Sequence, residues 1–108
     1  MNNMQQLLAK AQKLQAKVAE AQKELETKEV TGTAGSGMVT VVMSLKGIVK
    51  SISINPEIVN PDEKDMLEDL IIAALGDAKL NADKMYDEGM KDATGGMSLP
   101  GMGSGGLF

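Results

Sequence analysis

The sequence predicts an α+β fold in which a long helix precedes three strands and a second long helix follows them. Three observations support this order. Apolar residues recur at steps of three and four over residues 4–25, apolar residues alternate along residues 38–54, and a helix start signal occurs at residues 60–63. Because glycine-containing turns separate the strand segments, we expect a three-stranded antiparallel sheet.

The N-terminal helix has the clearest pattern. Its apolar residues form a narrow heptad seam, which is typical of a long helix that protrudes or pairs with another helix. Asn3 followed by Gln6 fits a capping box at its start, and most other positions hold residues that favour helix. The seam consists of Met4, Leu7, Ala11, Leu14, Val18, Ala21 and Leu25.

A glycine-rich stretch, Gly32–Val39 (GTAGSGMV), raises the question of whether it binds a phosphate or only turns the chain. Phosphate-binding loops follow G-x-x-x-x-G-K-[ST] or G-x-G-x-x-G and lead into a helix. Here the glycine spacing differs, no Lys-Ser/Thr pair follows, and the next segment resembles a strand. We therefore interpret Gly35-Ser36-Gly37 as a hairpin turn that follows an edge strand at Glu29–Ala34.

Two further strands are predicted, joined by a tight hairpin at Lys46-Gly47. Met38–Leu45 alternates a strongly apolar face with a mixed one. In Ile48–Ile54 the alternation is interrupted by Lys50. The apolar face of this last strand is predicted to contain Ile48, Ile52 and Ile54.

The second helix is predicted from Asn60 as the cap, Pro61 at the first helical position and acids in the first turn. Gly76 is a weak point in its interior. Residues 1–93 are predicted to form a single domain, and residues 94–108 (TGGMSLPGMGSGGLF) a disordered Gly/Met-rich tail. The apolar face of the helix is predicted to contain Leu67, Leu70, Ile71, Ala74, Ala78 and Met85.

The composition excludes several classes of function. The chain has no Cys and no His, which removes disulfides, thiol chemistry and catalysis or metal binding by imidazole. Clustered carboxylates could bind Mg²⁺ or Ca²⁺, but the EF-hand spacing is missing, and acids at a helix start stabilise the helix dipole. We expect no enzymatic activity, no metal and no cofactor. The cluster consists of Asp62, Glu63, Asp65, Glu68 and Asp69.

The charge distribution is uneven. Residues 1–53 contain seven Lys and four acids, a net charge of +3, whereas residues 54–108 contain four Lys and eleven acids, a net charge of −7. This asymmetry predicts a polarised surface. Met1–Lys10 lacks the pattern of a signal peptide, and the longest apolar run, Leu70–Leu75, is too short to span a bilayer. We therefore expect a soluble, cytoplasmic protein without membrane contact.

Lysines of the first helix are the candidate binding residues. Lys10, Lys13 and Lys17 are three and four residues apart, so they form one ridge, and no acid occurs before Glu20. Like charges at this spacing, near the positive end of the helix dipole, destabilise the helix slightly. Two interpretations follow: contacts with phosphates of DNA, or a solvated face that keeps a coiled coil soluble. Lys23 extends this basic half of the chain.

Several segments together resemble the YbaB/EbfC family of bacterial nucleoid-associated proteins. They are the glycine-rich segment before the strand pair, VKSISINP, DMLEDLIIAAL, and the Gly/Met/Leu tail that ends in Leu-Phe. The resemblance extends from Met4 to about Lys91. It implies a homodimer in which three-stranded sheets meet and long helices project like tweezers. It also implies binding to duplex DNA in the nucleoid and a structural role in organising the chromosome.

The resemblance supplies no catalytic motif and no compact set of DNA-contacting residues. The assignment of DNA binding to Lys10, Lys13, Lys17 and Lys23 therefore rests on charge and spacing. Because the chain has no Arg and almost no aromatic residues, we expect little base readout or base stacking, and hence weak sequence preference. The alternative is a non-enzymatic protein-interaction module that uses the helix seam or the Met-rich tail to hold a partner.

Overall fold

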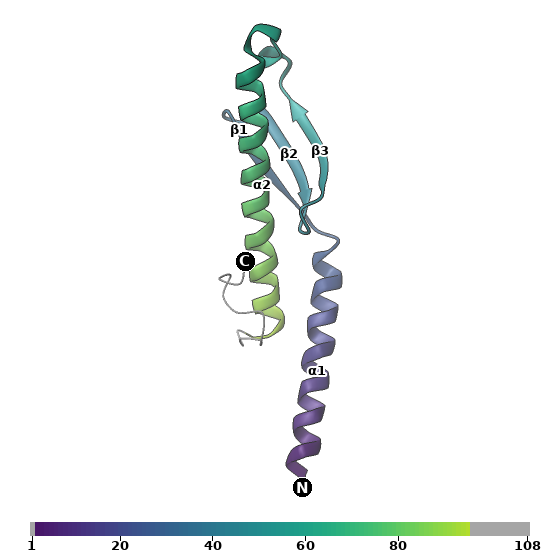
Figure 1. Ribbon diagram of the computed structural model, residues 1–108. Helices are drawn as coiled ribbons and strands as arrows, with labels where there is room; N and C mark the ends of the chain where they lie inside the picture. Colours follow the sequence, from purple (N-terminus) through teal and green to yellow (C-terminus); the bar gives the residue numbers. More distant parts are fainter. Residues whose placement is uncertain (1, 96–108) are drawn as a thin grey trace. The chain divides into compact units, whose positions relative to one another are not determined.

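The computed structural model describes residues 2–95, and their order of elements confirms the predicted α+β fold (Figure 1). They are α1 (Asn2–Leu25), β1 (Glu29–Ala34), β2 (Val39–Ser44), β3 (Val49–Ile54) and α2 (Lys64–Ala93), with short 3-10 turns at Pro56–Ile58 and Pro61–Glu63. These elements form two compact units, one from residues 26–85 and one from residues 2–25 with residues 86–95. None of these helices is both long and apolar enough to cross a membrane.

The ends of α1 and α2 differ in part from the prediction. Helix α1 begins at Asn2, so Asn3 lies inside the helix and not at the capping position. Asn60 does act as a cap, because its side chain accepts a hydrogen bond from the backbone N–H of Asp62 at 3.0 Å. The capped turn is a 3-10 helix, and α2 begins after it at Lys64.

The glycine-rich stretch is a turn, as predicted. Gly35, Ser36 and Gly37 have φ angles of 61°, 54° and 90°, and the N–H of Met38 donates to the carbonyl of Gly35. Positive φ is readily adopted by glycine, which explains the two glycines that flank Ser36. The turn joins β1 to β2, so it closes a hairpin.

The sheet is antiparallel with the order β1-β2-β3. Its pairing has a register shift between Val42 and Met43: Val42 lies opposite Ser51, whereas Met43 lies opposite Val49. Lys50 is therefore the extra residue of a β-bulge. The bulge explains why Lys50 interrupts the alternation of the sequence.

One face of the sheet is apolar, and we call it the apolar face. The bulge corrects the prediction for β3, because Val49 and not Ile48 lies opposite Met43 and so belongs to this face. Its members are Val30, Gly32, Ala34, Val39, Val41, Met43, Val49, Ile52 and Ile54.

Residues 64–85 of α2 pack against the apolar face at β1. Ala74, Ala78 and Ala82 are buried on the helix, and a Cβ at Gly32 would overlap the backbone of Ala74 and Ala78. Glycine is therefore required in β1, because strand and helix approach to backbone contact there. Of the predicted helix face, Met85 is an exception, since it is 38% exposed.

Two side chains of α2 also bond to the backbone of β1. Asp77 accepts a hydrogen bond from the N–H of Thr33 at 2.9 Å, and Asn81 donates to the carbonyl of Thr31 at 2.8 Å. The partners of β1 within the sheet lie on β2, so these bonds satisfy backbone groups on its outer edge. The outer edge of β1 is thus covered by the protein's own helix.

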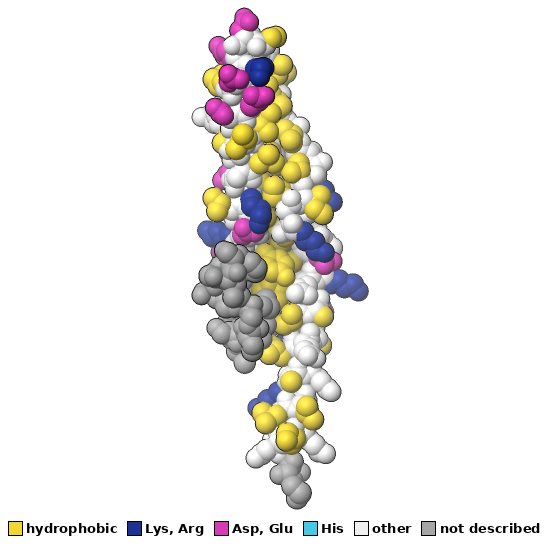
Figure 2. Space-filling model, in the orientation of Figure 1, with side chains coloured by type: hydrophobic (Ala, Val, Ile, Leu, Met, Phe, Trp, Pro, Cys, Tyr) yellow, Lys and Arg dark blue, Asp and Glu magenta, His cyan; other side chains and the backbone are white. Residues whose placement is uncertain are grey.

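The outer strand β3 is exposed. On the apolar face, Val39 and Val41 of β2 are fully buried, whereas Val49 and Ile52 of β3 are 42% and 44% exposed. Ile48, just before the strand, is 56% exposed. Figure 2 shows hydrophobic side chains gathered between α2 and β3 in this unit. The apolar face is therefore covered over β1 and β2 and open over β3.

Candidate nucleic-acid interface

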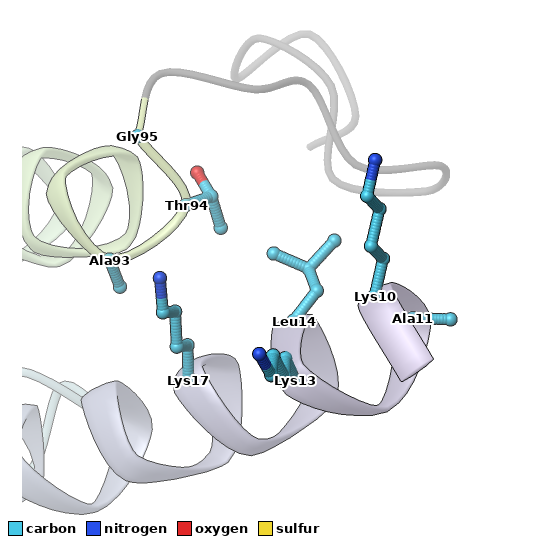
Figure 3. Close-up of a pocket in the computed structure, with 8 residues that line it drawn as sticks. All are labelled: Lys10, Ala11, Lys13, Leu14, Lys17, Ala93, Thr94 and Gly95. Atoms are coloured by element: carbon cyan, nitrogen blue, oxygen red, sulfur yellow. The ribbon is translucent and has the colours of Figure 1, made fainter. Parts of the chain in front are cut away.

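Three of the predicted lysines lie together on α1. Lys10, Lys13 and Lys17 are exposed, and they contribute to the lining of one pocket of about 400 Å³ (Figure 3). The pocket belongs entirely to the unit of residues 2–25 and 86–95. Its walls are formed by Lys10, Ala11, Lys13, Leu14 and Lys17 of α1 and by Ala93, Thr94 and Gly95 at the end of α2.

Thr94 and Gly95 follow α2 and terminate it. The Thr94 hydroxyl donates to the carbonyl of Met90 at 3.1 Å and to that of Lys91 at 3.3 Å, and Thr94 is buried. Gly95 has φ of 65°, the left-handed conformation that commonly ends a helix. Both residues were predicted to belong to the tail, but they follow α2 directly and form one wall of the pocket, whereas residues 96–108 of the predicted tail lie outside the described residues.

Contacts further along both helices hold α1 against the last turns of α2. Leu25 is buried, and a Cβ at Gly89 would lie 2.6 Å from its Cδ2, so the missing side chain of Gly89 makes room for Leu25. The Gln22 amide donates to the Tyr86 hydroxyl at 3.4 Å. Because α1 runs from the pocket toward Leu25 while α2 runs from Tyr86 toward the pocket, the two segments are antiparallel.

The three lysines are not neutralised by nearby acids. Among residues 2–95, none of them forms an ion pair, whereas Lys46, Lys64 and Lys79 pair with carboxylates. The first turn of α1 contains no acid, and Glu20 is its first acidic residue. The ridge therefore presents three positive charges that are available to an anion.

The pocket combines this charge with an apolar floor. Ala11, Leu14 and Ala93 contribute hydrocarbon, and in Figure 3 Leu14 and Lys17 both point from α1 toward the end of α2. Lysine side chains pack their methylene stems on apolar groups while the ammonium stays in water. Such a site fits a polyanion along the lysine ridge or an apolar segment on the floor.

Lys23 does not belong to this site. It is exposed but does not line the pocket, because six residues after Lys17 the helix has turned by about 120° from the ridge. It lies in the last turn of α1, where a cation interacts favourably with the helix dipole. Lys23 therefore stabilises the helix that contains it, whereas the lysines of the ridge do not.

Acidic side chains gather at the start of α2. Figure 2 shows several of them over the N-terminal end of α2, the region of Asp62 and Asp65. Within the described part of the chain, no group of three carboxylates is placed to hold a metal ion. These acids lie at the start of a helix, where negative charge is stabilising.

The wall formed by residues 93–95 is the part of the site that was not predicted from the sequence. Two signals in the sequence mark this helix end, namely Lys91 in the last turn and Gly95 just after it. The low-complexity composition of residues 94–108 obscured them. That α1 lies beside this helix end is a tertiary contact, which no local pattern indicates.

Comparison with known proteins identifies the family. The model of the YbaB/EbfC DNA-binding family matches residues 1–97, so the chain belongs to this family. A nucleoid-associated protein of Rhodospirillum rubrum is 46% identical over 100 residues, which cover 93% of this chain and 94% of the relative. One from Clostridium acetobutylicum is 42% identical over 100 residues, with coverage of 93% and 89%.

A solved structure has the same fold. The crystal structure of an uncharacterized protein from Helicobacter pylori matches with a TM-score of 0.65 and 17% identity. The match covers 78% of this chain and 88% of that protein. At this identity the likeness concerns the fold alone.

Proposed function

We propose that this protein is a homodimeric nucleoid-associated protein that binds duplex DNA through lysine–phosphate contacts. The observation that supports this most directly is the ridge of Lys10, Lys13 and Lys17, three exposed ammonium groups without ion-pair partners among residues 2–95. Membership of the YbaB/EbfC DNA-binding family supports DNA as the polyanion. A protein that organises chromosomal DNA would reside in the nucleoid.

The chemistry of the ridge predicts weak sequence preference. Lysine contacts with phosphate position a protein on the duplex but do not distinguish bases. The chain has no Arg, which makes the commonest bidentate contact with guanine. Base contacts are left to amides such as Asn3, Gln5 and Gln6, which are exposed at the start of α1, or to the shape of the DNA.

Binding must come from local charge, because the net charge of the chain is −4. Long-range attraction of the whole molecule to DNA is therefore weak. The acids at the start of α2 would repel phosphates, so the proposal requires that they stay away from the duplex. The lysines of the ridge and the acids at the start of α2 belong to different compact units of the protein.

The open part of the apolar face supports the homodimer. Val49 and Ile52 project from β3 and remain 42% and 44% exposed in the described part of the chain. A second copy that packs its own β3 and apolar face there would bury these residues in both protomers. Apolar patches on an edge strand otherwise favour non-specific association. A dimer would also present two lysine ridges to one duplex.

The test is fluorescence anisotropy of a labelled duplex at 50 and 200 mM salt. With three lysines per protomer, a dimer neutralises about six phosphates, so the logarithmic salt slope should be near −5. Affinity should then fall about a thousandfold between the two salt concentrations. Replacing Lys10, Lys13 and Lys17 by Gln should abolish most of this binding and flatten the slope.

The matched control changes three lysines that already have partners. Replacing Lys46, Lys64 and Lys79 by Gln alters the net charge equally but removes only paired cations. We expect this control to bind DNA nearly as tightly as the wild type. Equal losses in the two triple variants would show that net charge, not the ridge, controls binding. Absence of wild-type binding at 50 mM salt would contradict the proposal as a whole.

A protein-interaction module is the second candidate, and one observation favours it. Met4 and Leu7, the first two residues of the heptad seam, are 67% and 63% exposed in the described part of the chain, and the neighbouring Leu8 is 57% exposed. A partner helix could pack there. The triple lysine variant discriminates the two candidates, because binding of a protein partner to the seam should survive the loss of the lysines.

A further inference from the structure

We propose that the pocket between α1 and the end of α2 is the docking site of the chain's own C-terminal segment, residues 96–108. The apolar side chains of Ala11, Leu14 and Ala93 line the pocket, and the last residue of its lining is Gly95. The next residue of the chain is therefore the first of the proposed occupant. The competition with DNA described below rests on the proposed function, whereas docking itself does not.

The composition of the segment fits the floor of the pocket. Residues 96–108 contain no charged side chain, and Met97, Leu99 and Met102 occur within seven residues of Gly95. A span of four residues reaches about 13 Å, so Leu99 can reach any wall of a pocket of this size. Methionine adapts to irregular apolar surfaces, and an uncharged segment leaves the lysine ammonium groups in water.

Covalent attachment favours this occupant over a free ligand. A short flexible connection gives an attached segment a millimolar effective concentration at a neighbouring site. The favourable free energy of burying a few apolar side chains is offset by the conformational entropy that their residues lose when they become ordered. Docked and undocked states should therefore have comparable populations, and the equilibrium should respond to a competitor.

DNA would be that competitor. The lysine ridge lines the pocket, so a docked segment and a duplex would occupy the same side of α1. Coupling between two sites is reciprocal: if DNA displaces the segment, loss of docking strengthens DNA binding by the same factor. For comparable populations this factor is about two to five.

The first experiment measures docking by disulfide formation and requires no DNA. The chain has no Cys, so a pair of introduced cysteines reports one distance unambiguously. Ser98→Cys is combined with Ala11→Cys, which lines the pocket, or with Gln12→Cys, which lies about 170° round the helix from the middle of the five residues of α1 that line it. Both full-length proteins are oxidised mildly, and the intramolecular disulfide is quantified.

We expect the Ala11 pair to form the disulfide about tenfold faster than the Gln12 pair, because docking raises the local concentration on one face only. Replacing Met97, Leu99 and Met102 by Ser should equalise the two rates. Equal rates in the parent proteins would overturn the proposal. So would a preference that survives the serine replacements, or disulfides that form mainly between two molecules.

The second experiment measures competition. The serine-substituted segment, without introduced cysteines, should bind the duplex about two- to fivefold more tightly than the wild type, and duplex should slow disulfide formation in the Ala11 pair. Unchanged affinity together with an unchanged disulfide rate would overturn the competition. If the wild type binds no DNA at all, the proposed function fails, while the disulfide result still decides whether the segment docks.

Discussion

The two outer strands of the sheet, β1 and β3, differ in how far their unpaired edges are covered. At β1, Asp77 and Asn81 of α2 bond to backbone groups, and Gly32 packs against the helix. At β3, Val49 and Ile52 are partly exposed, and α2 bonds to the opposite edge of the sheet. Exposed apolar edges promote pairing with another chain. One edge is thus closed within the protomer, and the other is left for the proposed dimer.

The difference shows that apolar composition does not indicate which edge is buried within one chain. β1 is polar and contains glycine, yet α2 covers it closely. β3 is rich in isoleucine and valine, yet it is the exposed strand. Glycine in β1 permits the close approach of a helix, whereas the large apolar side chains of β3 become buried only when a surface of complementary shape packs on them.

The largest effect is expected where β1 meets α2. Gly32→Ala would place a Cβ against the backbone of Ala74 and Ala78, neither of which can move aside like a side chain. Overpacking of this kind should lower the free energy of unfolding by about 3 kcal/mol or more. Chemical denaturation followed by circular dichroism measures the change.

Gly76→Ala is the matched control. Gly76 lies in the interior of α2, and a Cβ there would have no neighbour within 4 Å. Because alanine favours helix more than glycine does, this substitution should stabilise the protein by about 0.5–1 kcal/mol. If Gly32→Ala and Gly76→Ala changed the free energy of unfolding in the same direction, the close approach of β1 and α2 would not explain the effect of Gly32→Ala.

The next effect concerns the open edge. Ile52→Lys places a charge on the apolar face at β3, and in the proposed dimer that charge would be buried. The dimer dissociation constant should rise about a hundredfold or more, without loss of the protomer fold. Sedimentation velocity over a range of concentrations measures it.

Ser53→Lys tests whether the effect depends on the face. Ser53 neighbours Ile52 in β3 and is exposed on the opposite face, opposite Thr40. Ser53→Lys adds the same charge as Ile52→Lys, and we expect it to leave the dimer dissociation constant nearly unchanged. A wild-type protein that is monomeric at micromolar concentration would refute the dimer itself.

The smallest effect is expected from the bonds that close β1. Asp77→Ala or Asn81→Ala removes a hydrogen bond to an edge backbone group that water can partly replace, so each should cost about 1 kcal/mol. Asp83→Ala removes only an exposed ion pair with Lys79 and should cost about 0.5 kcal/mol or less. Thermal unfolding measures the decrease in melting temperature for each variant. Equal decreases for the Asp77, Asn81 and Asp83 variants would mean that the hydrogen bonds to β1 stabilise the protein no more than an exposed ion pair does.

Local patterns predicted the elements and the turns of this fold. The heptad seam indicated α1, and the glycines around Ser36 indicated a hairpin, because both depend on residues close together in the chain. The bulge at Lys50 was visible only as a break in alternation, and its consequence for Ile48 and Val49 required the register. Neither the position of Gly32 against α2 nor the exposure of β3 follows from any local pattern.

The candidate site divides in the same way. Lys10, Lys13 and Lys17 could be placed on one ridge because a single helix fixes their spacing. The opposite wall, Thr94 and Gly95, comes from the other end of the chain, so only the folded structure brings it near. Charge patterns thus identified the ridge but not the pocket that it borders.

The contact between Gln22 and Tyr86 has a practical consequence. The chain has one Tyr and no Trp, so its intrinsic fluorescence originates almost wholly from one ring at the junction of α1 with α2. That junction joins residues 64 positions apart, whereas the two hairpins involve near neighbours. Closing the longer loop costs more entropy. Tyrosine emission therefore reports the formation of the contact between α1 and α2 separately from the formation of the sheet.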